Sequence, residues 1–215
     1  MNRFLPALVL GFAVAAPVQA DLPVDRDEIF FDVYRGDSRF GEHRVRFDQQ
    51  GEDLRVEVDI NLRVNFGPIN FFRYEHEAEE LWRDGELVSL QTETLEAGDR
   101  VRISAERQGS DFRVLNSALD RAAALPASLP PSSHWQGYEV GEESIFNTVT
   151  GEAMPVTVTY LGRETIEADG RTIEADRYRM SGTLTVDLWY DADGVWAKCY
   201  FEIDGERISY VRRAA

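Results

Sequence analysis

The chain has 215 residues, 39 of them acidic and 23 basic, which gives a formal net charge of −16. A protein this acidic repels nucleic acid and anionic membrane surfaces, which argues against both as partners. The single cysteine, Cys199, excludes an internal disulfide, and one cysteine with three histidines excludes an ordinary structural zinc site.

Residues 1–20 predict a cleaved secretory signal peptide. After Arg3, residues 4–16 form an apolar stretch that is too short to span a bilayer. Val18 and Ala20 then match the −3 and −1 positions of a signal peptidase site, and cleavage would leave Asp21 as the new N-terminus. Since no later apolar run suits a transmembrane helix, we expect a periplasmic or secreted protein with no transmembrane anchor. An uncleaved anchor helix is the alternative.

Alternating apolar and polar residues predict a single antiparallel β domain over residues 21–215. The longest example is residues 54–66, where every second side chain is apolar, as in a strand with one buried and one wet face. Such a strand would span about 40 Å, a length typical of curved sheets, half-barrels and barrels.

Tight turns separate about a dozen expected strands, so an antiparallel meander is the simplest topology. The expected strands cover residues 28–35, 41–48, 54–66, 71–83, 86–95, 101–107, 112–116, 154–161, 172–180, 183–190, 195–203 and 207–212. The turn at residues 191–194 predicts a hairpin with Trp189 opposite Trp196 and Asp187 opposite Lys198.

Residues 117–141 interrupt the strand pattern. An alanine-rich run predicts a short helix within residues 115–125, and the prolines at 126, 130 and 131 then end regular structure. Long loops in compact domains often carry function, so we expect a lid-like loop folded against the sheet. His134 would line a pocket or, as we prefer, tie this loop to the barrel rim.

No motif identifies a reaction: HExxH, CxxC, GxSxG, a P-loop and GxGxxG are all absent. The densest polar cluster is residues 74–82, where alternation places His76 and Glu80 on one face and Glu75, Glu77 and Glu79 on the other. One interpretation is a His/Glu pair for acid–base chemistry or a weak divalent site, with His43 adjacent. The interpretation we favour is a solvated acidic face opposite a mixed aromatic one.

Aromatic residues are concentrated in the first third of the domain, between residues 30 and 74. In a closed small barrel they would fill the interior, whereas in a half-open sheet they would line an apolar cavity for a lipid-like ligand. The sequence leaves both arrangements open.

Short motifs spread over residues 28–212 resemble a family of exported bacterial proteins. They are Phe31-Asp32-Val33-Tyr34-Arg35-Gly36, Gly41-Glu42-His43, Tyr74-Glu75-His76, Glu80-Leu81-Trp82, Ser133-His134-Trp135 and Leu188-Trp189-Tyr190-Asp191. Together they resemble the DUF6134 family, which is similar to DUF3108 and more distantly to the LolA-like half-barrels that carry lipids or lipoproteins. The resemblance implies an envelope β protein of unknown activity and supplies no catalytic residues.

We therefore expect a non-enzymatic envelope protein that binds an apolar small molecule or an envelope protein partner on a concave sheet, without cofactor or metal. The candidate ligand-binding residues are Phe66, Phe71, Phe72, Tyr74, His76, Trp82, His134 and Trp135. The alternatives are an assembly factor with a packed barrel, and a hydrolase that uses His76 or His134.

Overall fold

The computed structural model describes residues 26–66, 69–119 and 122–214, with the backbone alone for residues 64–66 and 69–71. The predicted signal peptide lies outside these ranges. The strands are β1 (Glu28–Arg35), β2 (Ser38–Gln50), β3 (Asp53–Phe66), β4 (Ile69–Arg83), β5 (Glu86–Glu96), β6 (Asp99–Gln108), β7 (Asp111–Asn116), β8 (Ala122–Pro126), β9 (Ser144–Asn147), β10 (Glu152–Ala168), β11 (Arg171–Gly182), β12 (Val186–Asp191), β13 (Trp196–Ile203) and β14 (Glu206–Arg212). Within these ranges no helix has the length and apolar character needed to cross a membrane.

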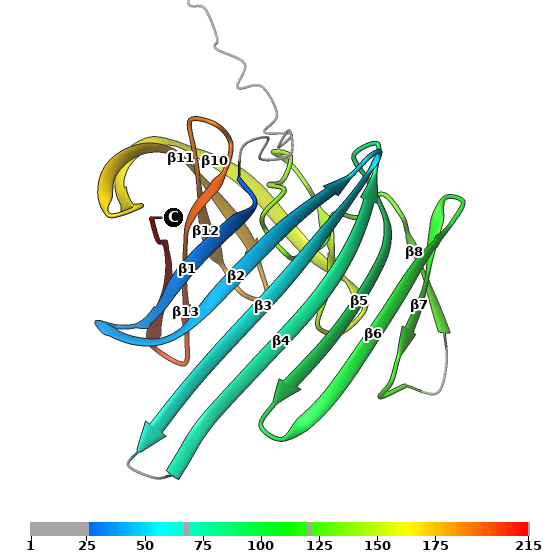
Figure 1. Ribbon diagram of the computed structural model, residues 1–215, viewed down its shortest axis with the longest axis horizontal. Helices are drawn as coiled ribbons and strands as arrows, with labels where there is room; N and C mark the ends of the chain where they lie inside the picture. The colour runs from blue at the N-terminus through cyan, green and yellow to red at the C-terminus, as the bar shows by residue number, and fades with distance from the viewer. Residues whose placement is uncertain (1–25, 67–68, 120–121, 215) are drawn as a thin grey trace, which may run out of the picture.

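All 14 strands belong to one antiparallel sheet, in the order β8-β7-β6-β5-β4-β3-β2-β1-β14-β13-β12-β11-β10-β9. Each half of the chain is a meander, and pairing of β1 with β14 joins the halves. Figure 1 shows the resulting curvature, with β2–β6 forming a broad wall and β10–β13 curving behind it. The predicted all-β curved sheet is confirmed.

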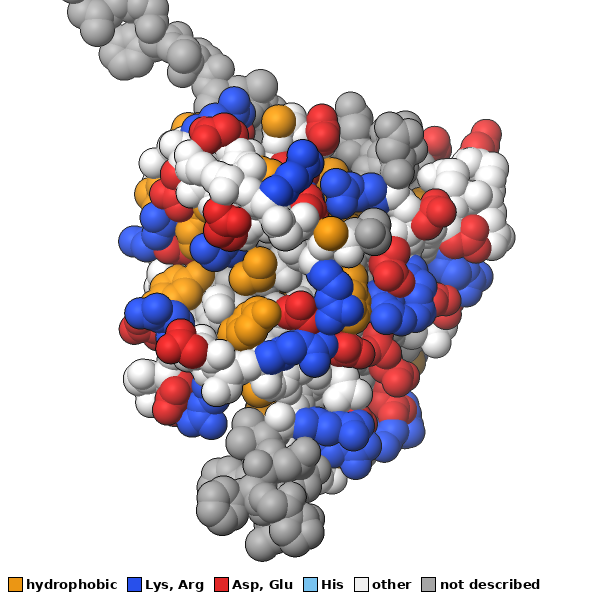
Figure 2. All heavy atoms as spheres, turned by 60° about the vertical axis from the view of Figure 1, so that its left-hand side comes forward, with side chains coloured by type: hydrophobic (Ala, Val, Ile, Leu, Met, Phe, Trp, Pro, Cys, Tyr) orange, Lys and Arg blue, Asp and Glu red, His pale blue; other side chains and the backbone are white. Residues whose placement is uncertain are grey.

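Strand β3 illustrates how the sequence pattern creates the two faces of the sheet. Leu54, Val56 and Val58 are buried, whereas Arg55 and Glu57 between them are exposed. On the outer face, charged side chains pair across neighbouring strands, as Arg55 does with Glu79 of β4, and Figure 2 shows basic and acidic groups interleaved over one side of the molecule. Exposed pairs of this kind stabilise a protein by at most about 1 kcal/mol, so the buried face holds the fold together.

The two edge strands, β8 and β9, do not share a backbone ladder, so the sheet is not closed. Side-chain contacts and two backbone hydrogen bonds, from Phe146 to the Pro130 carbonyl and from Ser132 to the Phe146 carbonyl, join β9 to the opposite end of the sheet and to the chain that follows β8. Across this seam the rings of Phe112 and Phe146 stack at 5.9 Å, and Thr92 donates a hydrogen bond to the Thr148 carbonyl over 2.8 Å. Gly151 is required here, because a Cβ atom would lie 3.1 Å from Ile103 and from Val114.

The helix expected within residues 115–125 is wrong. Strand β7 continues to Asn116, and Ala122–Pro126 forms strand β8, in which Ala123 pairs with Val114. Alanine favours a helix by only tenths of a kcal/mol per residue, and a ladder beside an available strand overrides that preference. The long irregular segment of the described chain is therefore residues 127–143, which we call the lid loop.

The predicted register of the β12–β13 hairpin is also wrong. Trp189 lies opposite Lys198, with a bulge between Trp189 and Tyr190, so Trp196 points into the core and is 1% exposed. Asp187 is instead bound by Arg177 and Arg179 of β11. The bulge shifts the pairing, which alternation alone does not reveal.

Candidate functional site

A cavity of about 310 Å³ lies on the concave side of the sheet, between the sheet and the lid loop. We call it the central cavity, and it contains all three histidines of the chain. It is lined by His43, Val58, Ile60, Tyr74, His76, Ala78, Ser132, Ser133, His134, Asn147, Thr148, Val149, Met154, Met180, Leu184, Val186, Trp196, Cys199, Phe201 and Tyr210.

Strand register places two of the histidines. His43 of β2 lies opposite Ile60 of β3, which lies opposite His76 of β4, and His76 in turn faces Thr94 of β5. Residues opposite one another across a sheet point to the same side, so this row projects into the concave face. Nδ1 of His76 and Oγ1 of Thr94 form a hydrogen bond of 2.8 Å.

The lid loop supplies the third histidine. His134 has a φ of 67°, a left-handed conformation that non-glycine residues seldom adopt. Two contacts hold it: the Tyr190 hydroxyl donates to the His134 carbonyl over 2.8 Å, and the Tyr138 hydroxyl lies 2.7 Å from Nδ1. The loop is therefore fixed against the sheet, with the imidazole facing the cavity.

Burial keeps the three imidazoles neutral. It lowers the pKa of His43 to about 3 and those of His76 and His134 to about 4. His43 is 3% exposed, and neither of its ring nitrogens has a hydrogen-bond partner in the described part of the chain. Its neighbours are instead aromatic, with ring centroids of Phe31, Trp196 and Tyr210 within 5.8 Å. An unpaired buried polar group is costly, so His43 is a conspicuous feature of this cavity.

A buried carboxylate holds the lid loop to the sheet. Oε2 of Glu80, in β4, accepts hydrogen bonds from the indole N–H groups of Trp82, over 2.8 Å, and Trp135, over 2.9 Å. Burial raises the pKa of Glu80, and no described residue bonds its Oε1 atom. Both of these tryptophans also line a second pocket.

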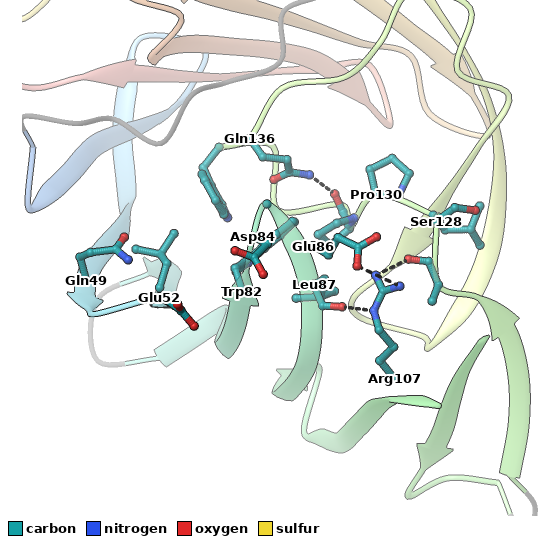
Figure 3. Close-up of a pocket in the computed structure, with 16 residues that line it drawn as sticks. Gln49, Glu52, Trp82, Asp84, Glu86, Leu87, Arg107, Ser128, Pro130 and Gln136 are labelled. Atoms are coloured by element: carbon teal, nitrogen blue, oxygen red, sulfur yellow. Dashed lines mark hydrogen bonds and ion pairs between the residues drawn. The ribbon is translucent and has the colours of Figure 1, made fainter. Parts of the chain in front are cut away.

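That second pocket, of about 310 Å³, lies at the rim beside the β4–β5 turn. Figure 3 shows Trp82 and Leu87 on one side of it and Pro130 and Gln136 of the lid loop on the other. Arg107 donates to the backbone carbonyls of Leu87 and Ala127, over 2.8 and 3.0 Å. The guanidinium thus fixes the start of the lid loop beside this rim pocket.

A family model for a domain of unknown function, DUF6134, matches residues 31–213. The chain belongs to the DUF6134 family. Among solved structures, this DUF6134 chain is similar to a β-barrel-like protein of another domain of unknown function, DUF1849, from Brucella abortus. The TM-score is 0.59 and the identity 9%, over 86% of this chain and 94% of that one, so the likeness shows the fold alone. A comparison with curated proteins found no match.

The predicted ligand-binding residues of the DUF6134 chain separate into groups. Tyr74, His76 and His134 line the central cavity, whereas Trp82 and Trp135 line the rim pocket. Phe72 is 37% exposed and lines neither of these pockets. The side chains of Phe66 and Phe71 lie outside the described part of the structure.

Two important residues of this DUF6134 site, His43 and Glu80, appear in the sequence analysis only within the less favoured interpretation, a His/Glu pair with His43 adjacent. Alternation correctly places Glu80 on the face of His76, but Glu80 binds two indoles, and His76 binds Thr94. The indole partner Trp135 lies 55 residues away, so no local pattern indicates this contact. The described residues include no group of three or more His, Cys, Asp or Glu side chains placed to hold a metal ion. Cys199 is buried in the cavity wall, and burial raises the pKa of its thiol.

Proposed function

We propose that this protein is an exported binding protein that holds one small apolar molecule in the central cavity. The observation that carries the proposal is the cavity itself, about 310 Å³ in volume, with the unpaired imidazole of His43 in its wall. Ligand pockets are mostly apolar, contain a few placed polar groups and begin at about 300 Å³. The volume of the central cavity lies at the lower end of the range for ligand pockets.

The lining favours an apolar ligand. Met154, Met180, Leu184 and Phe201 contribute flexible or aromatic surface, and none of the described lining residues is acidic, lysine or arginine. Leu184, Met154 and Phe201 are only partly buried, which indicates the side on which the cavity approaches solvent. A ligand would bury its apolar part here at about 25 cal/mol per Å² of surface removed from water.

Two observations favour binding over hydrolysis by His76 or His134. Their described hydrogen bonds are to the hydroxyl groups of Thr94 and Tyr138, and not to a carboxylate that would orient a general base. Their lowered pKa values also make both imidazoles weak bases near neutral pH. The buried carboxylate, Glu80, binds two indoles instead.

Native mass spectrometry tests the binding function. Protein incubated with a panel of ten-carbon chains that differ in their head groups should gain the mass of one ligand per chain. In the variant Ala78→Leu, extra atoms enter the cavity, and we expect binding to weaken at least about tenfold. Ala153→Leu adds the same atoms at an exposed position of β10 and should bind as the wild type does. An apo mass with every probe would refute the function and favour the packed-barrel assembly factor.

The export part of the proposal rests on the predicted signal peptide. N-terminal sequencing of the protein from the envelope fraction should begin at Asp21. A sequence that begins at Met1 would contradict cleavage.

A further inference from the structure

The tautomer of His134 indicates which kind of ligand the central cavity accepts. The Tyr138 hydroxyl lies 2.7 Å from Nδ1 of His134 and 3.1 Å from the Pro131 carbonyl, to which it donates. A hydroxyl has one proton and a carbonyl can only accept, so a Tyr138 hydroxyl that donates to Pro131 must accept from Nδ1–H of His134. The Pro131 carbonyl also accepts from Nε2 of Gln136 over 2.7 Å, and the opposite assignment would turn the lone pairs of the Tyr138 oxygen toward this carbonyl at 3.1 Å. His134 therefore carries its proton on Nδ1, and Nε2 is a bare acceptor.

His43 provides a hydrogen-bond donor in addition to the acceptor Nε2 of His134. A neutral imidazole has one N–H group and one lone pair, and no described residue uses either one on His43. Both imidazoles line the central cavity, and both pack against the ring of Trp196, with centroid distances of 5.2 Å for His43 and 5.6 Å for His134. The lining of the cavity thus offers a hydrogen-bond acceptor on His134 and a hydrogen-bond donor on His43 that no described residue uses.

The lining of the cavity disfavours an ionic head group. The described lining contains no carboxylate, lysine or arginine, and burial lowers the pKa values of the imidazoles. A buried ammonium group would have no counter-charge, and a carboxylate would gain one only if an imidazole took up a proton, which burial disfavours. An ether or ketone cannot donate to Nε2 of His134. A hydroxyl group both donates and accepts.

We propose that the ligand is a neutral apolar alcohol or phenol whose hydroxyl group donates to Nε2 of His134, in the cavity that His43 also lines. This assignment rests on the proposed function, because it names the ligand class of the same cavity. The remainder of the molecule occupies the apolar part of the cavity, near Met180 and Phe201.

The test compares four probes with the same ten-carbon chain: 1-decanol, decyl methyl ether, decanoate and decylamine. Calorimetry with the full mature chain should show decanol binding at least about tenfold more tightly than the ether, which cannot donate, and more tightly than either ion. Equal binding of decanol and the ether, or tightest binding of an ion, would overturn the assignment and leave the binding function standing. Binding of none of the four would refute both.

The variant His134→Asn tests whether the preference for decanol over the ether arises at His134. Asparagine tolerates the positive φ of this position. It should retain binding of the ether and lose the preference for decanol. Nitrogen-15 chemical shifts of the wild-type histidines provide a readout that does not depend on any variant. They should show the Nδ1–H form of His134 and a shift of its Nε2 upon decanol addition. An Nε2–H tautomer would overturn the proposal.

Discussion

The indole N–H of Trp135 in the lid loop donates to Oε2 of Glu80 in β4, a hydrogen bond between residues 55 positions apart in the chain. Trp82, on the same strand as Glu80, donates to the same oxygen. One buried carboxylate oxygen therefore attaches the lid loop to the sheet, and this loop also carries His134. The stability of the loop and the shape of the central cavity are consequently linked through Glu80.

Replacing Glu80 by leucine should destabilise the protein by about 3 kcal/mol, because two buried indole donors lose their acceptor. Glu80→Gln keeps an acceptor oxygen at nearly the same place and should cost about 1 kcal/mol or less. Urea unfolding measures the free energies. Hydrogen exchange should show faster exchange of residues 127–143 in Glu80→Leu alone, and equal effects of the two variants would contradict this role.

Replacing His43 by phenylalanine should increase the free energy of unfolding by about 1–3 kcal/mol at pH 7, because two buried polar atoms without partners are removed. His76→Phe is the matched control. It removes the partner of the Thr94 hydroxyl and should not stabilise the protein. A loss of stability in His43→Phe would show that His43 has a partner, such as a buried water.

Stability should fall as the pH decreases from about 6.5 to about 4. Burial lowers the pKa values of His43, His76 and His134 from the ordinary value of 6.5 to about 3, 4 and 4, so over this range the unfolded chain binds more protons than the folded one. Each such group contributes up to about 1.4 kcal/mol per pH unit. Burial raises the pKa of Glu80, so its contribution has the opposite sign.

Comparison of the wild type with His43→Phe isolates the contribution of His43 to this pH dependence of stability. The difference between their free energies of unfolding should widen as the pH falls from 6.5 to 4, in favour of the variant. Urea titrations at pH 7, 5.5 and 4.5 measure it. A difference that does not change with pH would mean that His43 keeps an ordinary pKa in the folded state.

Arg212 should be far more important for stability than its neighbour Arg213. The Arg212 side chain is 1% exposed and binds Asp169 and Asp191 over 2.7 and 2.6 Å. Arg212→Met leaves the largely buried carboxylate of Asp191 without an ion-pair partner and that of Asp169 with Arg26 alone, at 3.8 Å, and should cost about 3–5 kcal/mol. Arg213→Met breaks a half-exposed pair with Asp32 and should cost less than about 1 kcal/mol. Similar melting temperatures for the two variants would contradict this difference.

The sequence predicted the sheet well because alternation determines which face each residue occupies. Residues 54–66, for example, correspond closely to β3. The failures occur where pairing depends on distant partners. The alanine-rich run became β8 because β7 lay beside it, and the bulge at Trp189 moved Lys198 away from Asp187.

Half of the candidate site was predictable for the same reason. Alternation on β4 placed Tyr74 and His76 on one face, and that face lines the central cavity. The position of His43, on β2, could not be predicted in this way. It depends on the register between β2 and β3, which brings His43 beside Ile60. Trp135 and His134 line different pockets, and the backbone between them is left-handed at His134. No local sequence pattern predicts this backbone conformation.

The missing ladder between β8 and β9 has a mechanical consequence. In a fully hydrogen-bonded barrel, a change in circumference requires a whole row of backbone bonds to break. Here β9 is joined to the chain that follows β8 by two backbone hydrogen bonds, between Phe146 and residues Pro130 and Ser132, and to the far end of the sheet by contacts such as those of Phe112 with Phe146 and of Thr92 with Thr148. A change in the circumference of this sheet would therefore break fewer backbone hydrogen bonds at this seam than at a ladder between two paired strands.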